Sequence, residues 1–174
     1  MIRFLFFLFS IALLSCRAEK VKDSTSKKWG TAHSVDFNQE LNSREELKIN
    51  LFLAHHRELK SLATKSESGL RFMKYCVGSG EVVAQQGQEA IVRVKIELLD
   101  GSLCYETAKD EVERVIIAKS EKETGIHEAL QLMRKGDKAK IILPSYLGHG
   151  LLGDRMKIPP QSVLYIDIQL IDLN

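Results

Sequence analysis

A stretch of about twenty residues in the first half of the chain places its apolar side chains at helical spacing. Ser43 and Glu46, three residues apart, have the capping-box pattern that precedes helices. Apolar or aromatic positions then recur every three or four residues: Ile49, Phe52, His56, Leu59 and Ala63, with Leu47 and Leu51 widening the stripe. This pattern predicts an amphipathic helix over 43–65, inside a segment 36–66, that packs on the following residues or on a second copy.

From Leu70 onward the period changes from that of a helix to that of strands. Residues 70–75 are strand-like, and over 89–99 apolar side chains at 92, 94, 96 and 98 alternate with Ile91, Arg93, Lys95 and Glu97. Asp100-Gly101 then predicts a hairpin turn, with Leu103 continuing the ladder. Three more strands are predicted over 112–119, 138–143 and 163–173.

One short helix interrupts this series of strands. Residues 124–133 have helical spacing, and Lys135-Gly136 closes the segment. A loop with three glycines and Pro159-Pro160 separates the last two strands. The predicted fold class is therefore α+β: an antiparallel sheet of about five strands wrapped on one short α-helix and preceded by the amphipathic helix.

The first sixteen residues have the pattern of an export signal. A short start with Arg3 leads into an apolar core over 4–14 that is too short to span a bilayer, and Leu13-Leu14-Ser15-Cys16 follows. These four residues resemble the bacterial lipobox, which implies cleavage of a signal peptide 1–15 and lipidation of Cys16. Residues 16–35 are polar and rich in Lys and Ser, which predicts a flexible tether between the membrane and the folded part.

Charge and composition exclude several classes of function. Hydrophobic residues make up 44% and charged residues 28% of the chain, and the net charge is only +2, with no dominating basic run. A nucleic-acid partner is therefore not expected. The adjacent His55 and His56 point to different helix faces, so a metal site is not expected there. No cofactor is expected either. Cys76 and Cys104 leave two alternatives open, one disulfide or two free thiols.

Four motifs, in order, resemble the FKBP-type peptidyl-prolyl isomerases. They are the Asp100-Gly101 hairpin, the helix from Gly125 through Met133 to Gly136-Asp137, the stretch LPSYLGHG over 143–150, and Ile158-Pro159-Pro160 with LYIDIQL over 164–170. The resemblance implies an FKBP-like domain over 69–174. The lipobox, the tether and the single helix also resemble the gliding-motility-associated FKBP-like lipoproteins of Bacteroidetes.

The resemblance further implies a substrate pocket without a catalytic nucleophile. Its residues would be Val94, Cys104, Tyr105, Ile126, His149, Ile158 and Ile166, with Lys122 and Glu123 in place of the family's Val-Ile pair. Only Ile158 matches the usual family residue. The family has Tyr at 94 and 149, Phe at 104 and 166, Asp at 105 and Trp at 126, so the aromatic box is largely missing.

For His149 two roles stay open, a hydrogen bond to substrate or a cap on its own loop. For Ile158 and Ile166 an ordinary core position is the alternative to a pocket role, and for Cys104 a small buried hydrophobic position is the alternative to a reactive thiol.

Two functions are compatible with this pocket. The first is a lipid-anchored peptidyl-prolyl cis-trans isomerase of the bacterial cell envelope, facing the periplasm and helping exported client polypeptides with X-Pro bonds to fold, with activity weakened by the missing aromatic residues. The alternative is a catalytically degenerate FKBP-like binding module in an envelope assembly for gliding or secretion. In both cases the helix 43–65 is a candidate surface for a homodimer.

Overall fold

A computed structural model describes residues 31–174, which include three α-helices and seven strands. The signal peptide, Cys16 and residues 16–30 of the tether lie outside the described residues. The helices are α1 (Thr31–His55), α2 (Arg57–Leu62) and α3 (Thr124–Leu130), with a 3-10 turn over Ser145–Leu147. The strands are β1 (Thr64–Lys65), β2 (Arg71–Cys76), β3 (Glu89–Leu98), β4 (Leu103–Glu106), β5 (Glu113–Ile116), β6 (Lys138–Leu143) and β7 (Leu164–Leu173).

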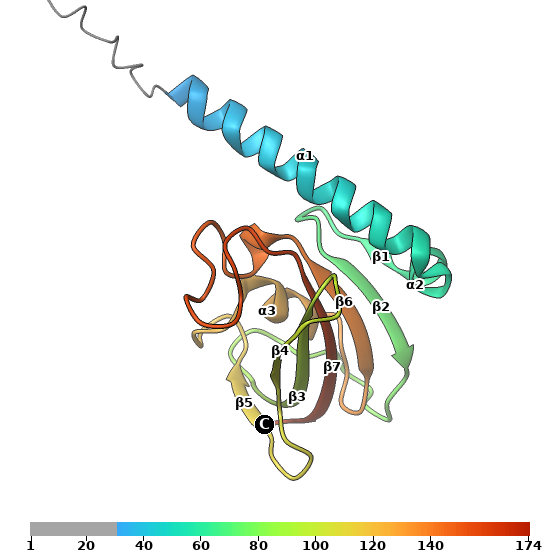
Figure 1. The fold of residues 1–174 in the computed structure, drawn as a ribbon. Helices are drawn as coiled ribbons and strands as arrows, with labels where there is room; N and C mark the ends of the chain where they lie inside the picture. The colour runs from blue at the N-terminus through green and yellow to red at the C-terminus, as the bar shows by residue number, and fades with distance from the viewer. Residues whose placement is uncertain (1–30) are drawn as a thin grey trace, which may run out of the picture.

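The strands form one antiparallel sheet in the order β1-β2-β6-β7-β3-β4, with β5 also paired to β3. The long pair β3–β7 runs from Ala90 opposite Leu173 to Leu98 opposite Leu164. Figure 1 shows the sheet curving around α3, with α1 running across the molecule and its N-terminal half extending beyond the strands. The predicted α+β class is confirmed, and the two-residue β1 is the strand that the sequence pattern missed.

Alternate residues of the strands supply two hydrophobic clusters on opposite faces of the sheet. On the α3 side, Ile126 and Leu130 pack in one cluster with Ile141 and Ile166, all fully buried. On the other side lies a smaller cluster, composed of Ile49, Leu53, Leu59, Met73, Ile142 and Val163. The helical segment therefore packs on the sheet of its own chain, the first of the two options that its amphipathic pattern left open.

The N-terminal helix differs from its predicted bounds. It begins at Thr31, so residues 31–35 of the predicted tether are helical, and it ends at His55, with α2 separate. No Gly or Pro lies between 31 and 42 to stop a helix. Ser43 consequently lies inside the helix, where its hydroxyl donates to the Gln39 carbonyl at 2.8 Å. The capping-box interpretation of Ser43 was wrong.

Three other predicted bounds shift by a few residues. The helix predicted over 124–133 ends at Leu130, because the chain turns there toward Gly136, which has φ +87. The strand predicted over 112–119 is limited to Glu113–Ile116, and the last strand begins at Leu164. Ala118 has a φ of 60, a left-handed conformation that a continuing strand cannot adopt, which explains the early end of β5.

Candidate functional site

A cavity of about 620 Å³ opens on the α3 side of the sheet. Strands β3, β4 and β5, the segment before α3 and the loop 148–156 all contribute to its wall. Its lining residues are Val94, Ile96, Tyr105, Glu113, Glu121, Lys122, Glu123, Gly148, His149, Asp154 and Met156. We call it the acidic cavity, because four of these side chains are carboxylic acids and one is a lysine.

The apolar part of the acidic cavity comes from β3. Val94 and Ile96 point to the same face of the strand and are almost fully buried in the cluster that packs on α3. Because they belong to this packed cluster, the core residues around them fix their positions. The cavity therefore has a rigid apolar floor below polar walls.

A tyrosine and an aspartate form one wall of the acidic cavity. The Tyr105 hydroxyl donates to the Asp154 carboxylate, which also accepts the backbone N–H groups of Met156 and Ile158, each at 2.8 Å. Burial alone would raise the pKa of Asp154, but these hydrogen bonds lower it to about 2. The same pair raises the pKa of Tyr105. Asp154 is consequently an anion at neutral pH that fixes the loop and the tyrosine together.

The opposite wall contains two further pairs. The Glu113 carboxylate lies 2.6 Å from the Lys122 ammonium and accepts the Thr107 hydroxyl at 2.7 Å. Burial by itself raises the pKa of Glu113, but the hydrogen bonds from Lys122 and Thr107 outweigh it and lower the pKa. Beside them, Nε2 of His149 lies 3.0 Å from Oε1 of Glu123, whose side chain is only 8% exposed. At positions 122 and 123 the wall thus has a lysine and a glutamate where the family resemblance implies an apolar Val-Ile pair.

The structure brings three of the seven predicted pocket residues to the cavity surface: Val94, Tyr105 and His149. The other four, Cys104, Ile126, Ile158 and Ile166, are at most 2% exposed and belong to the core cluster that contains Val94. For Ile158 and Ile166 this is the core position that the sequence left open as an alternative. His149 contacts Glu123 and does not cap its own loop.

Sequence reasoning missed three acidic residues of the wall: Glu113, Glu121 and Asp154. Asp154 lies in a Gly-rich loop, and Glu113 is at the start of a short strand, so neither position is marked by a motif. Lys122 and Glu123, which replace the family's Val-Ile pair, do line the cavity. That replacement was the one sequence feature that pointed to a charged wall.

The loop that carries His149 is held from the far side by α1. The Glu45 carboxylate is 1% exposed and accepts both the backbone N–H of Ser145, at 2.8 Å, and its hydroxyl, at 2.5 Å. Ser145 in turn accepts the N–H groups of Gly148 and Gly150 through its carbonyl. Next to Glu45, Glu46 pairs with the buried Arg71 at 2.5 Å. The N-terminal helix therefore stabilises one wall of the cavity.

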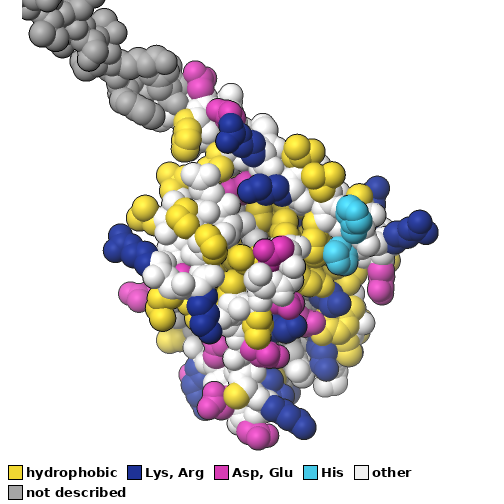
Figure 2. Space-filling model, in the orientation of Figure 1, with side chains coloured by type: hydrophobic (Ala, Val, Ile, Leu, Met, Phe, Trp, Pro, Cys, Tyr) yellow, Lys and Arg dark blue, Asp and Glu magenta, His cyan; other side chains and the backbone are white. Residues whose placement is uncertain are grey.

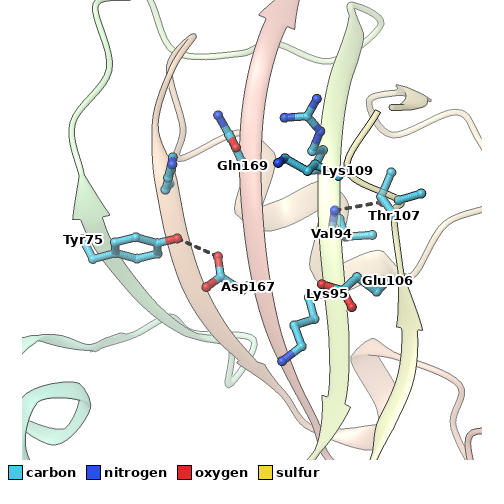
Figure 3. Close-up of a pocket in the computed structure, with 11 residues that line it drawn as sticks. Tyr75, Val94, Lys95, Glu106, Thr107, Lys109, Asp167 and Gln169 are labelled. Atoms are coloured by element: carbon cyan, nitrogen blue, oxygen red, sulfur yellow. Dashed lines mark hydrogen bonds between the residues drawn. The ribbon is translucent and has the colours of Figure 1, made fainter. Parts of the chain in front are cut away.

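A second cavity, of about 590 Å³, lies beside β3 on the outer surface of the sheet (Figure 3). We call it the basic cavity, since Arg93, Lys95, Lys109 and Lys138 outnumber Glu106 and Asp167 in its wall. In Figure 3 the Tyr75 hydroxyl donates to Asp167, at 2.8 Å. The pKa of Tyr75 is raised, mainly by burial and to a smaller extent by this hydrogen bond. Most of the residues that line this cavity are polar or charged.

Other kinds of site receive no support from residues 31–174. Over that range no group of three or more His, Cys, Asp or Glu side chains is arranged to hold a metal ion, and no helix has the length and apolar character of a membrane span. Cys76 and Cys104 are both free thiols, which settles the alternatives left open for them. Burial raises the pKa of the Cys104 thiol, which lies in the core as a small apolar side chain.

Comparisons with known proteins identify one family. The model of a family described as FKBP-type peptidyl-prolyl cis-trans isomerase matches residues 80–171. A "macrophage infectivity potentiator" from Trypanosoma cruzi is 27% identical over 168 residues, which cover 97% of this chain and 81% of that protein. The FKBP-type isomerase FkpA of Buchnera aphidicola from Schizaphis graminum is 29% identical over 71% of this chain, but the match covers only 48% of that protein.

A solved structure supports the fold. The crystal structure of FkpA from Escherichia coli matches with a TM-score of 0.60 and 23% identity, over 82% of this chain and 68% of that one. This chain therefore spans about half to two-thirds of the FkpA proteins compared. All lining residues of the acidic cavity, from Val94 to Met156, lie inside the range matched by the family model.

Proposed function

Because this chain belongs to the FKBP-type peptidyl-prolyl cis-trans isomerase family, we propose that it rotates X-Pro peptide bonds in the acidic cavity, and does so weakly. The observation that carries the proposal is the rigid floor of Val94 and Ile96 below the side chains of Tyr105 and His149. This cavity lies wholly within the range matched by the family and opens on the α3 side of the sheet.

Rotation of an X-Pro bond requires few specific side-chain groups. Rotation about the X-Pro amide meets a barrier of about 18–20 kcal/mol, because the twisted bond loses its resonance. Loss of resonance makes the carbonyl less polar, so an apolar surface that excludes water favours the twisted amide over the planar one. Val94 and Ile96 supply such a surface. No bond between heavy atoms breaks, so no nucleophile is needed.

The cavity walls explain why the activity should be weak. Val94 is smaller than the family's tyrosine, and Glu113, Lys122 and Glu123 bring charge and water close to the proline site. A loosely held proline ring reaches the twisted geometry less often, and each lost transition-state contact of about 1.4 kcal/mol lowers the rate tenfold.

A protease-free isomerase assay on the chain, with one restoring substitution, tests this function. We expect slow but measurable turnover of an X-Pro peptide in the wild type. His149→Tyr should raise kcat/KM by about tenfold, since it returns an aromatic hydroxyl to the wall. His55→Tyr is the matched control, because His55 is exposed at the end of α1 and far from the cavity wall. Turnover equal to that of an intact family member would contradict the account of the walls.

The second candidate function is a binding module of an envelope assembly, for gliding or secretion, that has lost catalysis. The observation in its favour is a pair of polar contacts in the wall of the cavity, the Glu113–Lys122 ion pair and the Glu123–His149 contact. If neither the wild type nor the folded His149→Tyr variant isomerises any X-Pro peptide but both bind one, this second function replaces the first.

The proposed setting is the bacterial cell envelope, with a lipid on Cys16 and exported polypeptides as clients. Support comes from the sequence alone, from the apolar core and Leu13-Leu14-Ser15-Cys16. Labelling cells with an alkyne fatty acid tests it: wild type should be labelled and Cys16→Ser should not. Equal labelling of the two proteins would contradict the anchor.

A homodimer through α1 is the remaining part of the proposal. Leu47 and Leu51 are 60% and 56% exposed on the surface of α1, while Ile49 and Leu53 are buried against the sheet. A concentration series by analytical ultracentrifugation, with Leu47→Ser and Leu51→Ser combined as the comparison, tests whether this exposed face brings two copies together. A wild type that stays monomeric at all concentrations would rule it out.

A further inference from the structure

The side chain of His127 holds the turn that leads into one wall of the acidic cavity. His127 lies on α3 and is 8% exposed. Its Nδ1 lies 3.0 Å from the backbone nitrogen of Ala118, and its Nε2 lies 3.0 Å from the carbonyl oxygen of Ser120. A backbone N–H can only donate and a carbonyl can only accept, so Nδ1 is the acceptor and Nε2 carries the proton. The ring is therefore neutral, in one tautomer, with both nitrogens bonded to the turn.

Both ends of the segment 118–123 are bonded to this one residue. At the far end, the backbone N–H of His127 donates to the Glu123 carbonyl at 3.3 Å. In the middle, the Ser120 carbonyl accepts the backbone N–H of Lys122, at 2.9 Å, as well as the ring. The last three residues of the segment line the acidic cavity. The position of this part of the wall therefore depends on His127, which does not itself line the cavity.

The turn that His127 holds is strained. Ala118 has a φ of 60, in the left-handed region that residues other than glycine rarely adopt. Such a conformation persists only where the surrounding structure holds it. The Ala118 N–H donates to the His127 ring, whereas the next two N–H groups, of Lys119 and Ser120, both donate to the Ile116 carbonyl. Loss of the ring acceptor would thus remove the contact that ties the strained residue to α3.

A proton on the ring has this effect. Histidine side chains ordinarily gain a proton as the pH falls from 8 to 5, and a protonated ring has two N–H groups and no acceptor for Ala118. In residues 31–174 no carboxylate is paired with the His127 ring to favour its charged form. The charged residues of the turn and of α3 have other contacts or are exposed: Lys122 pairs with Glu113, Glu123 contacts His149, Glu128 accepts the Ser68 hydroxyl, and Lys119 and Glu121 are exposed.

We propose that His127 is a positioning residue for the acidic cavity: the neutral ring holds residues 121–123 in the arrangement that binds an X-Pro peptide, and the protonated ring releases them. Peptide binding should consequently weaken as the pH falls. This inference rests on the proposed function, since it takes the acidic cavity as the peptide site. It assigns a role to a residue that the family resemblance did not place in the pocket.

Peptide affinity, measured by fluorescence anisotropy on the full chain in a mild detergent at pH 7.5 and at pH 5, tests the proposal. The peptide is a capped X-Pro segment without titratable side chains and with a rhodamine label, so that the change of pH acts on the protein. We expect the Kd of the wild type to rise about tenfold at pH 5, which corresponds to about 1.4 kcal/mol. Thermal melting at both pH values checks that the protein is folded.

Two substitutions assign the change to the ring. His127→Asn keeps an acceptor near the Nδ1 position but takes up no proton, and the Ser120 carbonyl keeps its other donor. This variant should bind like the wild type at pH 7.5 and lose less than about threefold at pH 5, the remainder coming from His149 in the wall. His127→Phe keeps a ring without an acceptor, and should bind about tenfold more weakly at pH 7.5. His55→Asn, at an exposed position, is the control and should keep the pH dependence of the wild type.

The outcomes separate this inference from the proposed function. If the wild type binds the peptide equally well at both pH values, the inference is wrong and the proposed function stands, and a lower Tm alone would show a merely structural role. If a folded His127→Asn variant loses as much affinity at pH 5 as the wild type, another group causes the pH dependence and the inference is overturned. If the peptide is neither bound nor isomerised at pH 7.5, both the proposed function and the inference are overturned.

Discussion

Two cavities of nearly equal volume, about 620 and 590 Å³, lie beside β3 and share Val94 in their walls. Each contains a tyrosine hydroxyl that donates to an aspartate, Tyr105 to Asp154 in the acidic cavity and Tyr75 to Asp167 in the basic one (Figure 3). Their charges are opposite. Size and the presence of a polar pair therefore do not distinguish a binding site from a surface hollow in this molecule.

The difference lies in what fixes the polar groups. Asp154 accepts two backbone N–H groups of its own loop, and Glu123 is almost fully buried. In the basic cavity, Lys109 and Glu106 extend from exposed positions into solvent. Figure 2 shows acidic and basic side chains interspersed over the visible surface, so exposed charges of this kind are common on the protein. Water and salt screen buried, fixed charges less than exposed ones, so the polar groups of the acidic cavity should affect a bound peptide more.

The largest expected effect comes from breaking the contact that fixes the acidic cavity's loop. Glu45→Ala leaves the buried N–H and hydroxyl of Ser145 without acceptors, and should lower the free energy of unfolding by about 3 kcal/mol. Peptide affinity should decrease as well, because Ser145 supports Gly148. Denaturant unfolding and peptide anisotropy measure the two effects.

Glu40→Ala is the control for that variant. Glu40 lies on the same helix and pairs with Arg44 at 2.5 Å, but both side chains are more than 60% exposed. Its loss should cost about 0.5 kcal/mol at most. If Glu45→Ala is no more destabilising than Glu40→Ala, α1 does not stabilise the cavity wall.

A matched pair of substitutions compares the two tyrosines directly. Tyr105→Phe removes the hydroxyl from the acidic cavity and should reduce kcat/KM for an X-Pro peptide by about tenfold, since the released Asp154 loop no longer fixes the wall. Tyr75→Phe removes the corresponding hydroxyl from the basic cavity and should leave kcat/KM unchanged. Equal losses in both variants would mean that the two cavities are not functionally distinct.

A smaller effect on stability is expected when the pH is lowered. The pKa of Asp154 is lowered to about 2, so its hydrogen bonds stabilise the folded chain at pH values above its ordinary pKa near 4, and this stabilisation is lost as the pH falls toward 2. Asp154→Asn should therefore have a lower Tm than the wild type at pH 7, with the gap closing between pH 4 and pH 2. Melting curves over that range measure it, and a gap independent of pH would contradict the assignment.

The smallest effect is expected from a substitution in the basic cavity. Lys109→Glu changes the charge of the basic cavity by two at an exposed position, and should alter both stability and the affinity for an X-Pro peptide by less than about 0.5 kcal/mol. A change in peptide affinity of tenfold would show that the basic cavity takes part in binding.

Periodicity in the sequence was sufficient to predict most of the sheet. The alternation around Val94 and Ile96 predicted β3, and Asp100-Gly101 predicted the turn, where Gly101 has φ +88. The bounds of the N-terminal helix were wrong, because capping patterns are local and a serine inside a helix satisfies its hydroxyl by another route, as Ser43 does with Gln39. Seven pocket residues were implied by resemblance, and three of them line the cavity.

The sequence by itself determined all strands except the two-residue β1, which faces are apolar and which family the motifs resemble, because these depend on spacing along the chain. The tertiary structure decided what the cavity contains. Asp154, Glu113 and Glu123 come from three segments that no motif joins, and they meet only when β5, the residues before α3 and the loop after β6 fold together. The Glu45–Ser145 contact joins residues 100 positions apart. Charge and hydrogen bonding at a site depend on such long-range neighbours, whereas secondary structure depends mainly on near ones.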